Sequence, residues 1–292
     1  MNERVIFSRL LEERLNDIGG SLGQSMFDGA LNVMEGNMVK EYDNLGMTYL
    51  LNYQTQRLAD YLNLSVYSQS YYPFINMAQK YADDASGTSL KPCDEANPVV
   101  NILNNRRSIR EYSGTPVTFA DISSILNGIQ NTHEVGEMTF RNTPSGGGLY
   151  PVTIYFHANR IEDIDEGVYR YQPSTNSILL IEKNTRDKIK EIYKNQLKID
   201  LDNYCALFMF VFDYVFCFQK YNNLALSLGL IETGMLAQNL ELIANSLDLG
   251  TCDIGGCDKV KGEELLKIDG MNQHLIYSVI MGSKKNNGGV QV

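Results

Sequence analysis

The sequence predicts a domain built from both helices and strands, with at least one antiparallel hairpin. Residues 118–129 place their apolar side chains on one face of a helix. Two β-rich runs, 167–171 and 177–181, flank a polar turn that contains Pro173, and this pattern is typical of a β-hairpin. Residues 207–212 are apolar throughout, which indicates a strand buried on both faces. Together these patterns predict a mixed fold class.

Capping residues mark the helix boundaries. Asn97 is a good N-cap and Pro98 suits the first helical position, so a helix is predicted to begin there. A second helix begins at Thr118, because Asp121 three residues later completes a pattern like a capping box. A third and much longer helix is predicted over residues 224–247.

The apolar pattern predicts the remaining elements. Residues 152–157 and 275–281 are β-rich apolar runs and are predicted strands. Residues 185–198 alternate charged side chains with Ile and Leu, which predicts a solvent-facing helix. In the long helix, Gly234 and Ala237 are small enough to let a neighbouring element approach closely.

The chain divides into three predicted regions. Residues 1–87 form a helical N-terminal region, with helices expected at 9–15 and 49–62. This region either completes a dimer or docks onto partner proteins, and the sequence leaves both roles open. Residues 88–285 form the main domain, and residues 286–292 are a polar, Gly-rich tail that is expected to be flexible.

Composition argues against several classes of function. The chain has 292 residues, is 43% hydrophobic and carries a net charge of −10. Such an acidic balance argues against broad nucleic-acid binding, which needs a basic face. The first residues lack the apolar core of a signal peptide, and the longest apolar run, 205–215, is broken by Asp213 and is too short to span a bilayer. We therefore expect a cytoplasmic protein that binds neither nucleic acid nor membrane.

Neither a metal centre nor a disulfide framework is expected. The five cysteines are odd in number and widely spaced, and only Cys252 and Cys257 lie close together, with no histidine near them. The three histidines are scattered along the chain. The cysteines are therefore interpreted as reduced thiols.

The chain is organised around a glycine-rich loop within residues 141–151. Gly146, Gly147 and Gly148 follow Pro144 and Ser145, and a predicted strand comes directly afterwards. Glycine lets a backbone adopt positive φ and approach a flat or charged ligand, and successive N–H groups in such a loop can form an anion-binding nest. Taken alone, the loop is equally consistent with a flexible turn before a strand.

A second unusual segment holds three arginines and a hydroxyl within five positions: Arg106, Arg107, Ser108 and Arg110. Arginines this close repel one another unless they are solvated or paired with an anion, and guanidinium suits bidentate phosphate contact. Together with the glycine loop, this segment predicts a phosphate-bearing cofactor. The sequence contains neither a P-loop nor a Rossmann glycine motif.

Several segments of the main domain resemble motifs of one enzyme family. Residues 106–112 resemble the opening motif of the nitroreductase superfamily of FMN enzymes. Residues 144–151 resemble one branch of it, the azoline dehydrogenases of streptolysin-type peptide-modifying systems. The Gly-x-Tyr-x-Tyr segment at 167–171, the Lys-Tyr pair at 220–221 and the Glu-Thr-Gly…Gln-Asn helix at 232–239 are similar to further motifs of that branch. The resemblance says little about the N-terminal region.

The resemblance implies an α+β fold in which helices flank an antiparallel-rich sheet, and an obligate homodimer with FMN at the subunit interface. The arginine segment would hold the phosphate, ribityl chain and pyrimidine edge, and the glycine loop would lie along the isoalloxazine. The Gly255-Gly256 pair would reach the flavin N5 and O4 region, and Lys284 or Lys285 would contact the phosphate. The implied cofactor-binding residues are Arg106, Arg107, Ser108, Arg110, Pro144, Ser145, Gly146, Gly147, Gly148, Gly255, Gly256 and Lys284.

The implied reaction gives Lys220 and Tyr221 catalytic roles. Aromatising a thiazoline or oxazoline ring in a ribosomally made peptide removes a proton and a hydride, and the flavin takes the hydride. A lysine that is desolvated beside arginines has a lowered pKa and can accept the proton. Tyr221 would orient the substrate, relay the proton or assist the base. The expected partners are the azoline-containing precursor peptide and the cyclodehydratase subunits of a synthetase complex.

One departure from the family pattern keeps other functions open. The family usually follows Lys-Tyr with a segment containing Arg-Gly-Tyr-Arg, whereas this chain has Leu224-Ala-Leu-Ser227 there. The alternatives are an NAD(P)H-dependent nitro- or quinone reductase and a catalytically silent scaffold subunit of a peptide-modifying synthetase. The sequence identifies neither the peptide nor the ring type nor the acceptor that reoxidises the flavin.

Overall fold

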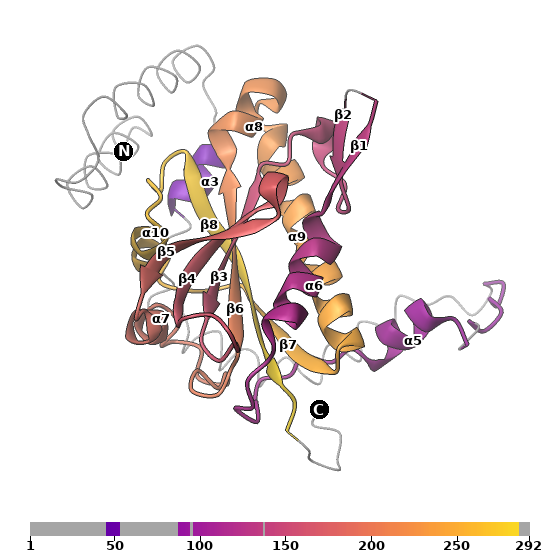
Figure 1. Ribbon diagram of the computed structural model, residues 1–292. Helices are drawn as coiled ribbons and strands as arrows, with labels where there is room; N and C mark the ends of the chain where they lie inside the picture. Colours follow the sequence, from indigo (N-terminus) through magenta and orange to yellow (C-terminus); the bar gives the residue numbers. More distant parts are fainter. Residues whose placement is uncertain (1–44, 53–86, 94–95, 137, 286–292) are drawn as a thin grey trace.

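A computed structural model describes residues 45–52, 87–93, 96–136 and 138–285, and a six-stranded sheet lies at its centre (Figure 1). The strands of this sheet are β3 (Val152–Ala158), β4 (Gly167–Gln172), β5 (Ser177–Lys183), β6 (Ala206–Asp213), β7 (Leu249–Ile254) and β8 (Gln273–Ser283). Their order is β5-β4-β3-β6-β8-β7, and every neighbouring pair is antiparallel. The α+β class with an antiparallel sheet is confirmed.

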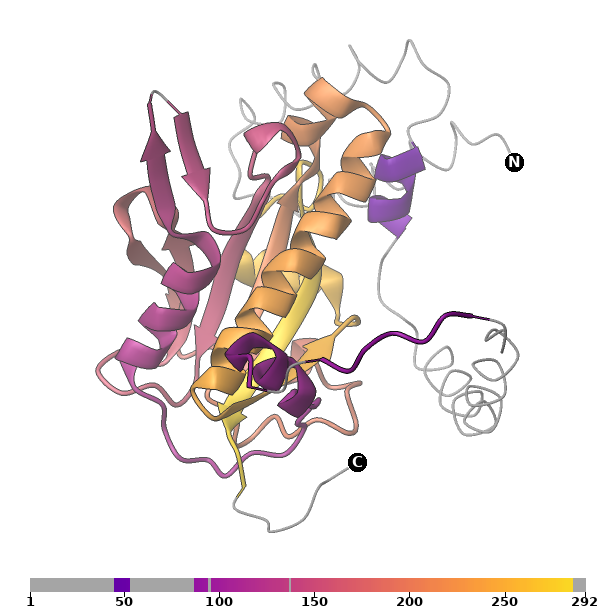
Figure 2. The same cartoon turned by 90° about the vertical axis from the view of Figure 1, so that its right-hand side faces the viewer.

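Helices cover both faces of the sheet (Figures 1 and 2). One face carries α3 (Leu45–Asn52), α6 (Phe119–Gln130), α8 (Tyr214–Tyr221) and α9 (Leu224–Ser246). The opposite face carries α7 (Arg186–Ile192) and α10 (Lys259–Leu266). A further short helix, α5 (Pro98–Asn105), contacts the carboxyl-terminal part of α9 and projects from the body of the molecule.

The central strand β6 shows why the sheet needs helices on both sides. Phe208, Phe210 and Phe212 pack into the core beneath α6 and α9. The alternating side chains, Leu207 and Met209 among them, pack into the core beneath α7 and α10. Successive side chains of a strand point to opposite faces, so a continuously apolar strand requires two cores. The prediction of a strand buried on both faces is confirmed.

The predicted helix starts are confirmed at the level of hydrogen bonds. The Asn97 side chain accepts from the amides of Val99 (3.0 Å) and Val100 (3.5 Å), with Pro98 in the first position of α5. Thr118 accepts from the Asp121 amide at 3.1 Å, and the Asp121 carboxylate accepts from the Thr118 amide at 3.0 Å. The capping box therefore sets the start of α6.

The predicted strands are also present. Residues 152–157 lie in β3 and residues 275–281 lie in β8. The predicted hairpin is β4 paired with β5, and a short 3₁₀ turn at Pro173–Thr175 connects them. The chain leaves this turn through Asn176, whose φ of 44° is left-handed, a conformation that Asn tolerates better than most residues.

Some elements differ from the prediction. The helix expected over residues 185–198 ends at Ile192, and its Ile189 and Ile192 are buried against the sheet instead of facing solvent. Their apolar side chains help to cover the second core, which a charge-alternating pattern does not reveal. Sequence analysis missed the projecting hairpin of β1 (Thr132–Val135) and β2 (Met138–Arg141), the edge strand β7, and the helices α8 and α10.

The described helix of the N-terminal region is α3, and it belongs to the main core. Met47, Leu50 and Leu51 are buried there, and Gly46 lies against the ring of Tyr214. Of the helix expected at residues 49–62, only 49–52 are described. The helix expected at 9–15 and the tail at 286–292 lie outside the described residues, and the division into three regions stays a prediction. Among the described helices, none combines the length and apolarity that crossing a membrane requires.

Candidate functional site

The glycine loop lies between β2 and β3 and folds into a tight turn. Gly146–Gly148 forms a single 3₁₀ turn, in which the Gly148 amide donates to the Ser145 carbonyl at 3.1 Å. Gly147 and Gly148 have φ values of 63° and 67°. Residues with a side chain are strained in this left-handed region. Because two successive positions adopt it, glycine is favoured at both.

Lys220 and Tyr221 occupy the last turn of α8 and reach this loop. The Lys220 ammonium donates to the Gly147 carbonyl at 3.4 Å and lies 5.3 Å from the centre of the Tyr221 ring. A Cβ atom on Gly147 would overlap the Tyr221 hydroxyl and would lie 2.6 Å from Lys220 Nζ. The structure therefore brings the predicted catalytic pair and the glycine loop together, and only glycine fits between them. Lys220 is exposed in the single chain, whereas the sequence argument expects a desolvated lysine.

Helix α9 holds the loop from beneath. The hydroxyl of Ser145 hydrogen-bonds to the buried carboxyl of Glu232 and also accepts from the Tyr150 amide at 2.8 Å. Two turns further along α9, the Asn239 side chain donates to Thr143 Oγ1 at 2.9 Å. Burial raises the pKa of Glu232 against the opposing effect of its bond to Ser145. We name this assembly, the loop 143–150 with Lys220, Tyr221 and Glu232, the loop cluster.

The arginine segment lies elsewhere, alongside the edge strand β7. Ser108 forms a parallel bridge with Thr251, and the Ile109 amide donates to the Thr251 carbonyl at 2.7 Å. Arg107 turns its guanidinium onto the carbonyls of Asn104 (2.8 Å) and Arg106 (2.7 Å). Arg110 makes a long contact to the Ser108 carbonyl at 3.5 Å.

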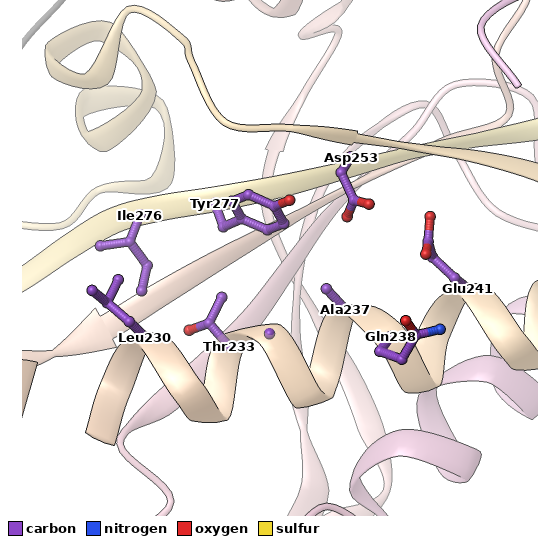
Figure 3. Close-up of a pocket in the computed structure, with 9 residues that line it drawn as sticks. Leu230, Thr233, Ala237, Gln238, Glu241, Asp253, Ile276 and Tyr277 are labelled. Carbon is purple, nitrogen blue, oxygen red and sulfur yellow. The ribbon is translucent and has the colours of Figure 1, made fainter. Parts of the chain in front are cut away.

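A pocket of about 280 Å³ lies between α9 and the strands β7 and β8 (Figure 3), and one of its lining residues, Glu241, pairs with Arg106. The Arg106 guanidinium lies 3.9 Å from the Glu241 carboxylate. Glu241 and Asp253 project into this pocket from opposite sides. Burial, followed by the charge of Asp253, raises the pKa of Glu241 to about 7, against the opposing effect of Arg106. The lining residues are Leu230, Thr233, Gly234, Ala237, Gln238, Glu241, Asp253, Ile276 and Tyr277.

The remaining predicted cofactor residues lie at the ends of β7 and β8. Gly255 and Gly256 directly follow β7, and a Cβ atom on Gly255 would meet nothing within 4 Å. The Gly256 carbonyl accepts from the Gln196 side chain at 2.7 Å. Lys284 pairs in an antiparallel bridge with Tyr112, at the end of the arginine segment, and its ammonium lies 2.8 Å from the Asp248 carboxylate. We name residues 106–112, the pocket, Gly255, Gly256 and Lys284 the arginine cluster.

The two clusters contact different faces of α9: the loop cluster contacts Leu228, Glu232 and Asn239, and the pocket is lined by Leu230, Gly234, Ala237 and Glu241. Gly146 in the loop cluster packs on Leu228, and Arg106 in the arginine cluster pairs with Glu241. At a rise of about 1.5 Å per residue, these two points on the helix are roughly 20 Å apart. The structure therefore assembles each cluster at its own face of α9.

The side chains present fit a flat, anionic cofactor. Within the described ranges, Arg107 and Arg110 form no ion pair, so their charges remain available to a phosphate. Cβ atoms on Gly148, Gly234 and Gly255 would all meet open space, which leaves room for a planar ring against the backbone. Glu241 and Asp253 oppose an anion near Arg106, although a Glu241 with a pKa near 7 is partly neutral at physiological pH.

Sequence analysis missed the acidic lining of the pocket. Leu230, Gly234, Ala237 and Glu241 recur at intervals of three and four residues and so share one face of α9. That spacing was the signal in the sequence from which the lining of the pocket could have been predicted. We expected Gly234 and Ala237 to admit a close neighbour. Ala237 is buried in the core, whereas Gly234 faces the open pocket, which both residues line.

Comparison with known proteins gives consistent results. Residues 103–283 match the sequence profile of the Nitroreductase family. The protein MJ1384 of Methanocaldococcus jannaschii, whose name places it among the nitroreductases, is 30% identical over 169 residues, which cover 58% of this chain and 83% of that protein. The structure is similar to the E. coli microcin synthetase McbBCD complex with truncated pro-MccB17 bound (TM-score 0.56, 17% identity, 70% of this chain and 77% of that chain). It is also similar to a nitroreductase-type structure from Ralstonia eutropha (TM-score 0.54, 20% identity, 70% and 89%). At these identities the structural likenesses show the fold.

Proposed function

This chain belongs to the nitroreductase family of oxidoreductases, which generally bind flavin, and from that premise we propose that it is an FMN-dependent azoline dehydrogenase. It would oxidise thiazoline or oxazoline rings in a ribosomally made peptide to the corresponding azoles. The observation that carries this proposal is the meeting of Lys220, Tyr221 and the Gly147 backbone in one place. A general base at this place suits a reaction that removes a carbon-bound proton from its substrate, a step that a reductase fed by NAD(P)H does not perform.

In this proposal the loop cluster performs the proton chemistry. Lys220 Nζ accepts the proton from the α-carbon of the ring, and the Gly147 carbonyl and the Tyr221 ring hold the amine in place. The Tyr221 hydroxyl, next to Gly147, orients the ring or relays the proton. FMN, when bound, supplies the acceptor for the hydride. Because Lys220 is exposed in the single chain, bound flavin, peptide or a second copy must desolvate it.

The arginine cluster would hold the cofactor. Arg106, Arg107, Ser108 and Arg110 provide charge and donors for the phosphate and its neighbourhood, with Lys284 at the end of β8 beside them. At Gly255 a Cβ atom would meet nothing within 4 Å, which leaves space for the flavin ring beside the Gly255-Gly256 segment. The glycine loop, residues 144–148, would lie along the other side of that ring.

Because the glycine loop and Arg106 contact different faces of α9, at points about 20 Å apart along the helix, we propose that a complete site takes a second copy of the chain. The surface of α9 and α5 supports such a homodimer. Leu230 and Ile231 on α9 are 43% and 59% exposed, and Val99 and Leu103 on α5 are also exposed. Apolar surface of this kind on neighbouring helices marks an interaction site. A two-fold arrangement would set the loop cluster of one copy against the arginine cluster of the other.

The proposed partners are the azoline-containing precursor peptide and the cyclodehydratase subunits that form the ring. The fold occurs in the McbBCD complex, which binds truncated pro-MccB17, so it is compatible with work inside a peptide-modifying synthetase. We propose that residues 1–87 dock onto these partner subunits or complete the dimer.

The test begins with the cofactor. The purified protein is expected to show a flavin spectrum, and the released chromophore to be FMN at about one per chain. A synthetic thiazoline peptide should then lose about 2 Da, the mass of two hydrogens, when it is incubated with the protein and its partner subunits. A flavin-loaded protein that instead oxidises NADPH with a nitroaromatic or quinone would be a reductase. A colourless protein that takes up no FMN would overturn both readings.

A further inference from the structure

Two side chains on one face of α9 form hydrogen bonds with the glycine loop and with the residue just before it. Glu232 bonds to Ser145 within the loop, and Asn239 bonds to Thr143 just before it. These two α9 residues are seven positions apart, which is about two helical turns, so they point in the same direction. Thr143 is itself fixed, because its hydroxyl donates to the Ile129 carbonyl of α6 at 2.7 Å.

Of these two side chains, Glu232 is the one that bonds within the loop itself, two residues before Gly147. Its side chain is buried, with the residue only 2% exposed. One carboxyl oxygen, Oε2, bonds to the Ser145 hydroxyl, and the carboxyl also interacts with the Val152 backbone, while Oε1 makes no hydrogen bond of normal geometry within the part of the chain that the structure describes. Burying a carboxyl that is only half satisfied costs free energy. An apolar residue of similar size would avoid this cost, so packing alone does not account for the glutamate.

The bond to Ser145 also organises the turn itself. The Ser145 hydroxyl accepts from the Tyr150 amide, and the Ser145 carbonyl accepts from the Gly148 amide. Ser145 thus closes the loop from both ends, and Glu232 fixes Ser145. The remaining contact of the loop with α9, Leu228 against Gly146, is apolar and carries no directional preference.

We propose that Glu232 is a positioning residue that, by holding Ser145, fixes the Gly147 carbonyl against Lys220 and Tyr221. This inference rests on the proposed dehydrogenase function for its kinetic consequence. The distances make the position demanding, because Lys220 Nζ is 3.4 Å from the Gly147 carbonyl and the Tyr221 hydroxyl leaves no space beside Gly147. A displacement of about 1 Å in such a site is enough to lower turnover by about 100-fold.

Two variants of Glu232 test the proposal in the full chain. Glu232→Gln keeps the size of the side chain and its ability to bond Ser145, whereas Glu232→Ala removes the bond. Hydrogen exchange measured by mass spectrometry on peptides spanning residues 143–150 should accelerate about tenfold in Glu232→Ala and stay within about twofold of wild type in Glu232→Gln. Turnover of the thiazoline peptide should fall about 10- to 100-fold in Glu232→Ala with KM little changed, and Glu232→Gln should restore most of it.

Controls separate this role from a loss of stability. Glu263→Gln alters a buried carboxyl of α10 on the opposite face of the sheet, and should lower the melting temperature without faster exchange in the loop. If Glu232→Ala does not fold, Ser145→Ala removes the same bond from the loop side and should reproduce both effects. Where Glu232→Ala folds, combining it with Ser145→Ala should add little further loss, because both changes remove the same interaction.

The outcomes are distinguishable. Unchanged loop exchange in Glu232→Ala would overturn the inference, and so would faster exchange accompanied by normal turnover. If wild-type protein does not convert the azoline peptide, the proposed function fails. The exchange measurements then still decide whether Glu232 holds the loop against Lys220.

Discussion

The two clusters on α9 are built in different ways. The loop cluster depends on a left-handed glycine turn, on contacts between residues far apart in the sequence, and on one buried carboxyl. The arginine cluster depends on a short segment that runs beside β7 and keeps its guanidinium groups near its own backbone. The loop cluster holds a few groups in closely fixed positions, as proton transfer requires. The arginine cluster provides positive charge and accessible backbone, as cofactor binding requires. Variants should therefore separate turnover from flavin binding.

The largest effect is expected in the loop cluster from Lys220→Ala. Removing the proposed base should lower azoline oxidation by about 1,000-fold or more, while flavin content and melting temperature stay close to wild type, because Lys220 is exposed. Lys198→Ala, an exposed lysine outside both clusters, is the control and should oxidise normally. Steady-state conversion of the thiazoline peptide and the flavin absorbance measure the two properties. Loss of flavin in Lys220→Ala would contradict the expectation that turnover and flavin binding depend on different clusters.

Gly147→Ala tests the geometry of the same cluster. The positive φ alone should cost about 1–2 kcal/mol of unfolding free energy, and overlap with Tyr221 should add to this and displace Lys220, lowering turnover by about 100-fold. Gly136→Ala is the matched control, because Gly136 has a φ of 65° and a Cβ atom there would meet nothing within 4 Å. It should show the strain cost without the loss of turnover. Equal stability and turnover in the two variants would contradict the close packing at Gly147.

In the arginine cluster, Arg107→Gln should weaken FMN binding. Loss of one charged phosphate contact should raise the FMN dissociation constant by about 10- to 100-fold, and saturating FMN should restore most of the turnover. Fluorescence titration of the flavin-free protein measures the affinity. Lys198→Gln, which removes one positive charge from the exposed surface outside both clusters, is the control. If turnover stays low at saturating FMN, the segment does more than hold the cofactor.

The smallest effect concerns Glu241 in the pocket. Burial and Asp253 raise its pKa from 4.5 to about 7, so the folded state holds a proton that the unfolded state has lost between those pH values. This contribution to stability is complete below pH 4.5 and disappears as the pH rises through 7. Glu241→Gln should therefore be more stable than wild type by about 1–2 kcal/mol at pH 8 and nearly equal below pH 4.5.

Denaturant unfolding across this pH range measures the effect. Glu264→Gln, an exposed glutamate of α10, is the control and should leave the pH dependence unchanged. A Glu241→Gln profile parallel to that of wild type would contradict the perturbed carboxyl.

Sequence patterns predicted the parts of this molecule that depend on local chemistry. Asn97 and Thr118 mark helix starts because capping is a contact within one turn, and residues 207–212 mark a central strand because both faces are buried. The pattern could not predict that α7 ends at Ile192, because burial of that residue depends on packing against the sheet.

The candidate site divides in the same way. The glycine loop, the arginine segment and the Lys-Tyr pair were recognisable because each is contiguous in the sequence. Two hydrogen bonds of the site depend on tertiary structure. One joins Ser145 to Glu232, 87 residues later in the chain, and the other joins Thr251 to Glu241 across the pocket. No local signal reports such pairs, and the placement of the two clusters on different faces of α9 is likewise a property of the folded chain.

Complementation between two inactive variants tests the central claim most directly. Lys220→Ala damages the loop cluster, and Arg107→Glu damages the arginine cluster. If each flavin site takes one cluster from each of two copies, a mixed dimer contains one intact site, and coexpression should restore about a quarter of wild-type azoline oxidation per chain. Coexpressed variants that stay as inactive as each variant alone, although mixed dimers form, would show that one chain builds the whole site and would contradict this account.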